Sequence, residues 1–184
     1  MRADARRNYE RLLACAHEAF TERGADASLE DIARRAGVGI GTLYRHFPTR
    51  ETLLTALLSD QLRGLTAYAE QELVQQEPGE AMANWILAMS RHGRIYRGLA
   101  AGVLSQQLGD RTEFDEACAA AQEAGDRVLH RAQAAGAVRP DVARAHLVAL
   151  VHGLVLATEN SPELFDQLLA VMLDGLQRVT SPAS

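Results

Sequence analysis

Lysine is absent from the chain, and all 19 of its basic side chains are arginine. Without lysine the sequence cannot complete a phosphate-binding P-loop, and its six histidines form no H-E-x-x-H metal motif. Cysteine is almost absent too. Cys15 and Cys118 stand far apart and unaccompanied, which indicates neither a disulfide framework nor a zinc site and favours a reducing cytoplasm. The sequence therefore predicts no metal, no cofactor and no catalytic group, and we expect a protein that is not an enzyme.

Aromatic residues and prolines are few: 5% of the 184 residues are aromatic and 5 residues are proline. Alanine and leucine are abundant instead, and the prolines fall at the boundaries of helical patterns, which together favour an all-α fold of about nine helices. Long apolar runs are missing as well. The most apolar run, residues 147–157, is interrupted by His152 and is too short to span a bilayer, so no membrane segment is expected.

Acidic residues outnumber basic ones, and the net charge is −5 at pH 7. The charge is divided unevenly: residues 1–50 hold nine arginines against seven acids (+2), and residues 51–184 hold ten against seventeen (−7). This asymmetry suggests a basic head on an acidic body, as expected of a head that binds nucleic acid. The division of charge thus agrees with such a function.

Residues 28–47, SLEDIARRAGVGIGTLYRHF, contain two short helical patterns joined by a turn that glycine marks. Ser28 can cap the first helix, and Asp31, three residues later, resembles the acidic partner of a capping box. The apolar residues of this helix recur at helical spacing and are expected to face inward: Leu29, Ile32, Ala33 and Ala36. Gly37 follows them, where a left-handed conformation would end the helix without a steric penalty.

The second helix of this stretch is expected to begin near Gly39 and to run through Phe47, because Pro48 disfavours helical geometry in the residue before it. Its apolar residues should face the first helix and its polar residues should face outward: Ile40, Leu43 and Phe47 on one side, Thr42, Arg45 and His46 on the other. Outward donors of this kind can reach phosphate oxygens or base edges, and the major groove of DNA admits such a helix. Two packed helices without a DNA-binding role are the alternative.

Residues 36–54, A-G-V-G-I-G-T-L-Y-R-H-F-P-T-R-E-T-L-L, resemble the signature of TetR-family transcriptional regulators. The resemblance implies a helix-turn-helix DNA-binding domain at residues 1–50, extending into a fourth helix to about residue 64. It also implies contacts with the DNA backbone at the positions of Thr42, Tyr44 and His46, and a phosphate contact at Arg50. Gly39 departs from the family pattern, which often has serine there as a helix cap and DNA contact. The predicted DNA-binding residues are Arg35, Gly39, Thr42, Tyr44, Arg45, His46 and Arg50.

The resemblance further implies that residues 51–184 form a ligand-binding and dimerisation domain for an unknown small-molecule effector. Seven residues combine apolar bulk with a few polar groups, as small-molecule pockets do, although core packing would explain each of them as well: Trp85, Met89, His92, Tyr96, Phe114, Cys118 and His152.

The last two helical patterns, residues 142–158 and 162–179, have a wider apolar surface than one core-facing stripe needs. In the family, the corresponding helices pair with those of a second subunit in a four-helix interface. The predicted dimer contacts are Val148, Val151, Val155, Leu164, Leu168, Val171, Met172 and Leu176. The buried core of a monomer is the alternative.

The function that we expect is that of a ligand-responsive homodimeric repressor in the cytoplasm, which binds a pseudo-palindromic operator in double-stranded DNA. Three alternatives remain open. The protein could activate transcription; it could bind a small molecule without reading DNA, for which Gly39 is the only local hint; or it could be an enzyme in which a buried histidine and an acid meet across helices.

Overall fold

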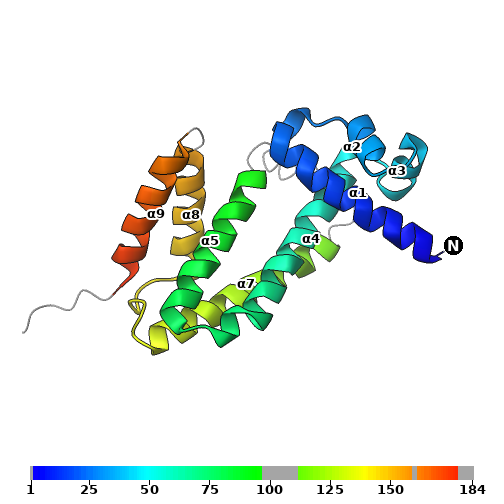
Figure 1. Ribbon diagram of the computed structural model, residues 1–184. Helices are drawn as coiled ribbons and strands as arrows, with labels where there is room; N and C mark the ends of the chain where they lie inside the picture. The colour runs from blue at the N-terminus through cyan, green and yellow to red at the C-terminus, as the bar shows by residue number, and fades with distance from the viewer. Residues whose placement is uncertain (1, 97–111, 159–160, 178–184) are drawn as a thin grey trace, which may run out of the picture. The chain divides into compact units, whose positions relative to one another are not determined.

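The computed structural model describes residues 2–96, 112–158 and 161–177, and of residues 2–3, 25, 92–96 and 162 only the backbone (Figure 1). Within these ranges the chain contains eight α-helices and two short 3-10 helices and no strand, so the predicted all-α class is confirmed. The elements are α1 (Arg2–Arg23), η1 (Gly24–Asp26), α2 (Leu29–Arg35), α3 (Ile40–His46), α4 (Arg50–Gln71), η2 (Leu73–Gln75), α5 (Pro78–Tyr96), α7 (Thr112–Ala134), α8 (Arg144–Ala157) and α9 (Pro162–Leu176).

The chain divides into two compact units. The first comprises residues 1–62 and 94–118, and the second comprises residues 63–93 and 119–184. The first unit contains the whole of the stretch that resembles a helix-turn-helix. The functional domain limits inferred from the sequence, residue 50 with an extension to about residue 64, stay a prediction.

The core of the first unit is built from the inward faces of its helices. Leu12, Ala16 and Phe20 recur every four residues along α1 and are 0–2% exposed. Ile32 of α2 and Leu43 of α3 are fully buried in the same core. Burying a side chain of this size contributes about 1.5–3 kcal/mol. These contacts therefore stabilise α2 and α3, which are too short to be stable as isolated helices.

Glycines with a positive φ follow α1, α2 and α7 in the described ranges; the first of them, Gly24, has a φ of +56°. Gly37, after α2, has a φ of +66°, and Gly136, after α7, has a φ of +75°. Both angles lie in the left-handed region, which side chains with a Cβ disfavour. The turn that carries the chain from α2 into α3 therefore depends on a glycine at position 37.

The second unit has its own core, to which α5, α7, α8 and α9 contribute Ile86, Ala132, Val151 and Phe165, each at most 7% exposed. The sequence pattern predicts a break at Gly93, but α5 continues to Tyr96. One helical glycine costs only about 1 kcal/mol, which the neighbouring turns can absorb. The helical pattern expected at residues 99–108 lies outside the described residues. No helix of the described ranges combines the length and the apolar character that crossing a membrane requires.

Candidate nucleic-acid interface

Helix α2 begins and ends as its sequence dictates. Ser28 is its N-cap, with extended backbone angles, and its Oγ accepts a hydrogen bond from the Asp31 amide at 3.4 Å. The Ser28 hydroxyl donates in turn to Oε2 of Glu30 at 2.7 Å. At the other end, the amide of Gly37 donates to the carbonyl of Arg34 at 3.1 Å. The predicted cap and stop are thus confirmed, and α3 follows after a short turn.

Helix α3 presents a mixed surface. Gly39 is its N-cap and offers no side-chain hydrogen bond, while Leu43 is fully buried and Phe47, which follows the helix, is 2% exposed. Ile40 was expected to face inward with them, and this expectation is wrong, because 37% of Ile40 is exposed. Ile40 is the first residue of α3 and lies where the buried side of the helix, on which Leu43 lies, comes to its end.

The outward side of α3 carries the polar residues. Tyr44 is 45% exposed and Arg45 is exposed, with its Nε donating to the carbonyl of Gly41 at 3.1 Å. Thr42 is half-buried, and its hydroxyl oxygen lies 3.5 Å from Nη2 of Arg45. His46 is half-buried as well, because its ring packs edge-on to Tyr9 of α1 with the ring centroids 6.1 Å apart. Tyr44 and Arg45 are therefore the predicted DNA contacts within α3 whose side chains are exposed.

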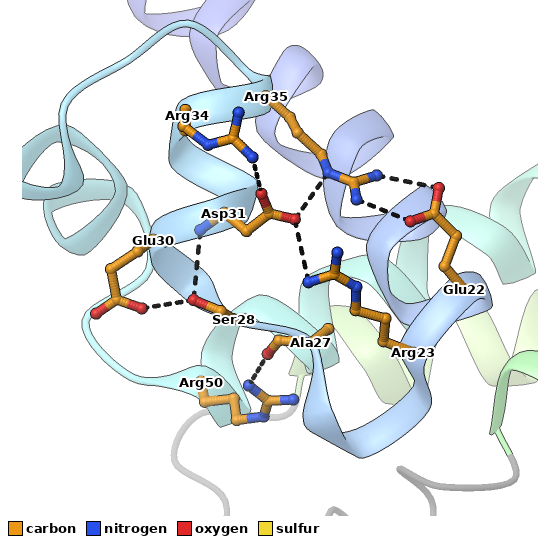
Figure 2. A network of polar contacts seen from close by, with 9 residues as sticks. All are labelled: Glu22, Arg23, Ala27, Ser28, Glu30, Asp31, Arg34, Arg35 and Arg50. Carbon is orange, nitrogen blue, oxygen red and sulfur yellow. Dashed lines mark hydrogen bonds and ion pairs between the residues drawn. The ribbon is translucent and has the colours of Figure 1, made fainter.

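Two other predicted DNA contacts are engaged within the protein (Figure 2). The guanidinium of Arg35 pairs with the carboxylates of Glu22 and Asp31, and its side chain is 24% exposed. Nη1 of Arg50 donates to the carbonyl of Ala27 at 2.6 Å. The same guanidinium lies 5.0 Å from the ring centroid of Phe20, within the range of a cation–π interaction.

A third arginine of this unit also binds a backbone carbonyl. Nη2 of Arg11, on α1, donates to the carbonyl of Ala36 at the end of α2. The carbonyls of Ala27 and Ala36 flank α2, so Arg50 and Arg11 hold its two ends. No pattern in the sequence indicates these links, since each joins residues more than twenty positions apart.

The ion pairs shift the pKa values of the carboxyl groups. The hydrogen bond from Arg35 lowers the pKa of Glu22, and hydrogen bonds from Arg34 and then Arg35 lower the pKa of Asp31. The pKa of Arg35 is raised in return, first by its hydrogen bond to Glu22. Elsewhere in the unit, burial raises the pKa of the Cys15 thiol, which favours its neutral, unreactive form.

The predicted ligand-binding residues lie in different places. Phe114 and Cys118 belong to the core of the first unit, whereas Trp85 and Met89 belong to the core of the second. His152 is exposed on α8. The side chains of His92 and Tyr96 lie outside the described part of the structure. The described members of the set are thus divided between two cores and one exposed position, and the pocket itself stays a prediction.

The predicted dimer contacts divide into two sets. Val151, Val155 and Leu176 are buried in the core of the second unit, with Val148 and Met172 half-buried at its edge. The remaining three residues of the prediction are exposed side chains of α9: Leu164, Leu168 and Val171.

Two further exposed leucines, Leu150 and Leu156 of α8, lie outside the predicted set of dimer contacts. They lie in the most apolar run of the sequence, residues 147–157, which was the signal that could have found them. With Leu164, Leu168 and Val171 they are the large exposed apolar side chains of α8 and α9, and we call this set the α8/α9 face. A groove of about 620 Å³ runs along it and passes Gly153 and Gly175.

Proteins similar to this chain are transcriptional regulators. Residues 12–57 match the family of bacterial regulatory proteins named tetR, and residues 77–178 match the C-terminal domain of SbtR-like transcriptional regulators. A crystal structure of the TetR transcriptional regulator SCO0520 from Streptomyces coelicolor is 33% identical, covers 93% of this chain and 99% of its own, and superposes with a TM-score of 0.76. A TetR regulatory protein from Mycobacterium vanbaalenii is 34% identical over 96% of this chain and 99% of its own, with a TM-score of 0.71.

Curated relatives match over a shorter stretch. An HTH-type transcriptional regulator of Staphylococcus aureus strain USA300 is 44% identical over 54 residues, which are 29% of this chain and 29% of that regulator. The resemblance seen in the sequence is confirmed by the two family matches and by structural similarity along almost the whole chain. The chain belongs to the TetR family of DNA-binding transcriptional regulators, which are not enzymes.

Proposed function

We propose that the chain is a homodimeric repressor that binds a pseudo-palindromic operator through α3. The observation that carries the proposal is the exposed polar side of α3, which we call the reading face. Tyr44 and Arg45 project from it, while the buried Leu43 fixes the helix to the core. A phenol hydroxyl and a guanidinium donate hydrogen bonds to phosphate oxygens, and arginine also pairs with guanine edges. The proposed contacts with DNA are completed by the residues around them: Gly39, Thr42, His46 and Arg50.

The proposal is tested by selecting bound fragments from random and genomic DNA with the purified protein. Recovery of an inverted repeat is expected. Tyr44→Phe and Arg45→Ala should then weaken binding to that repeat, and each lost phosphate contact should lower the salt slope by about 1. Arg127→Ala is the matched control, because Arg127 is an exposed arginine of α7 that pairs with Glu70. Unchanged affinity in both α3 variants would refute the assignment of the reading face.

The proposed dimer uses the α8/α9 face. Leu156 and Val171 are each 67% exposed there, and a monomer in water gains nothing from presenting such a surface. Two subunits joined along it would supply the two reading helices that a palindrome requires, with half-sites roughly 34–36 Å apart. Gly153 and Gly175 in the groove would let the helices of two subunits approach closely.

An effector is part of the proposal. A small molecule bound in the second unit would lower operator affinity if it bound more tightly to a conformation that fits the operator less well. Screening of small molecules for release of the selected DNA tests this step. Transcription of a reporter behind the operator, with and without the protein, distinguishes repression from activation. Failure to enrich any DNA at low salt would favour a small-molecule-binding protein that does not read DNA.

A further inference from the structure

Arg35 joins two helices of the first unit. Its two terminal nitrogens donate to the two carboxylate oxygens of Glu22 at 3.1 and 2.8 Å, and its Nε donates to Oδ2 of Asp31 at 2.8 Å (Figure 2). Glu22 lies at the end of α1, and Asp31 and Arg35 lie in the first and last turns of α2. The guanidinium thus spans from one helix to the other, and its planar fork satisfies both carboxylates at once.

The surroundings of Arg35 are poorly suited to a phosphate. The side chains of Arg35 and Asp31 are only 24% and 12% exposed, and both charges that Arg35 faces are negative. Asp31 is also paired with Arg34 and lies 3.8 Å from Arg23, so its carboxylate is the centre of a small network. A DNA phosphate at Arg35 would have to displace a bidentate carboxylate and approach a second one. Both steps cost free energy that a phosphate binding to an exposed arginine would not lose.

The network controls the helix that precedes α3. Arg11 and Arg50 hold the backbone at the two ends of α2, and Arg35 adds a link from its side to α1. A turn of only a few residues leads from α2 into α3, so a rotation of α2 is passed on to the reading face. Sub-ångström placement matters for donors that must meet phosphate oxygens, because hydrogen bonds weaken steeply with angle and distance.

We propose that Arg35 is a positioning residue for DNA binding, which acts through Glu22 and Asp31 to fix α2 and hence α3, and that it does not itself contact phosphate. This inference rests on the proposed function, since it concerns how the same reading face is held. It replaces the prediction from the sequence that Arg35 belongs to the set of direct DNA contacts.

Glu22→Gln provides the sharpest test, because the two interpretations predict opposite signs. If Arg35 contacts phosphate, removing the competing negative charge of Glu22 should leave DNA affinity unchanged or improve it. If Arg35 positions α2, the loss of the bidentate pair should weaken binding by roughly two- to five-fold, the range expected for an ion pair near the surface. Glu10→Gln is the matched control: it removes the same charge from α1, where Glu10 pairs only with Arg6 of the same helix in the described contacts.

A second pair of variants separates the charge of Arg35 from its shape. Arg35→Lys keeps the positive charge but cannot bridge two carboxylates in the same fork geometry. A phosphate contact predicts nearly full affinity for Arg35→Lys and a salt slope lowered by about 1 for Arg35→Gln. The positioning role predicts that both variants weaken binding to a similar degree and that the salt slope stays that of the parent.

Affinities are measured on the full-length protein with the selected operator, well below the melting midpoint of each variant, so that a merely stabilising role would leave them unchanged. Weakened binding by Glu22→Gln, with Glu10→Gln like the parent, is the expected result. Parent-like binding by Glu22→Gln in the folded protein would overturn the inference and leave the proposed function intact. Failure of the parent protein to bind any DNA would overturn both.

Discussion

Gly37 and Gly39 lie two residues apart in the turn before α3, and the structure predicts opposite effects when each is replaced by serine. Gly39 has a φ of −70° and a ψ of 149°, the extended geometry of a helix N-cap, and an added Cβ would meet no atom within 4 Å. Gly37 has a φ of +66°, and an added Cβ would lie 2.6 Å from Nη2 of Arg11. One site is thus ready for a side chain, and the other excludes one.

The expected gain at Gly39 has two parts. A serine N-cap exceeds glycine by only a few tenths of a kcal/mol. Replacing a glycine whose backbone angles suit any residue adds about 0.4–1 kcal/mol by restricting the unfolded chain. The sum is close to 1 kcal/mol, which should raise the melting temperature of a chain of this length by about 2–4 °C.

The expected loss at Gly37 is larger. A residue other than glycine in the left-handed region costs about 1–3 kcal/mol. The guanidinium of Arg11 can move away from the new Cβ, since it is the end of a flexible side chain, but it would then lose its hydrogen bond to the carbonyl of Ala36. Gly37→Ser should therefore melt several degrees below the parent protein.

Thermal unfolding followed by circular dichroism measures both variants against the parent. Operator affinity measured on the same samples shows whether a cap at position 39 alters reading as well as stability. A lower melting temperature for Gly39→Ser, or a shift of both variants in the same direction, would refute the account of this turn.

Three further predictions concern acid, core packing and assembly. Hydrogen bonds from arginines lower the pKa values of Glu22 and Asp31, whose ordinary values are 4.5 and 3.8, so their stabilising effect is complete above those values and is lost as pH falls through the lowered ones. The melting temperature of Glu22→Gln should consequently fall less than that of the parent between about pH 5 and pH 3. An equal fall in both proteins would contradict this reasoning. Gly125→Ala would place a Cβ 2.9 Å from the indole of Trp85. We expect about 1–3 kcal/mol of destabilisation and a change in the fluorescence emission of this single tryptophan. Unchanged emission and stability would show that the ring can move aside. Val171→Asp should convert the proposed dimer into monomers in sedimentation experiments, with the melting of secondary structure still cooperative. The control Val74→Asp, at another exposed valine, should sediment like the parent protein.

Local sequence rules were sufficient to predict much of the structure of residues 28–47, which contain α2 and α3. The cap at Ser28, the stop at Gly37 and the burial of Ile32 and Leu43 follow from residues within a few positions of one another, and the structure confirms each of them. The error at Ile40 has the same origin. Helical periodicity places it on the buried side, but periodicity carries no information about where the neighbouring helix stops covering that side.

Links between distant residues could not be predicted in this way. Glu22 and Arg35 are separated by 13 positions, and the carbonyl that Arg11 binds belongs to a residue 25 positions away. From the sequence alone, arginines are expected to be solvent-exposed charges. Only the packing of α1 against α2 reveals which of them have partners in the protein. For the same reason, the sequence did not indicate that Phe114 and Trp85 belong to different cores.

The anchors at the two ends of α2 have an evolutionary consequence. Arg11 and Arg50 bind peptide carbonyls, and a point mutation of the residue that carries the carbonyl does not delete the acceptor. Ala27 and Ala36 could therefore be exchanged for any residue that fits their buried sites without breaking the link, whereas the loss of either arginine removes it. Selection on such a contact would act on the donor alone, so no correlated change of two positions would mark it among descendants of this protein. The contact between Glu22 and Arg35, which needs both side chains, would leave such a mark.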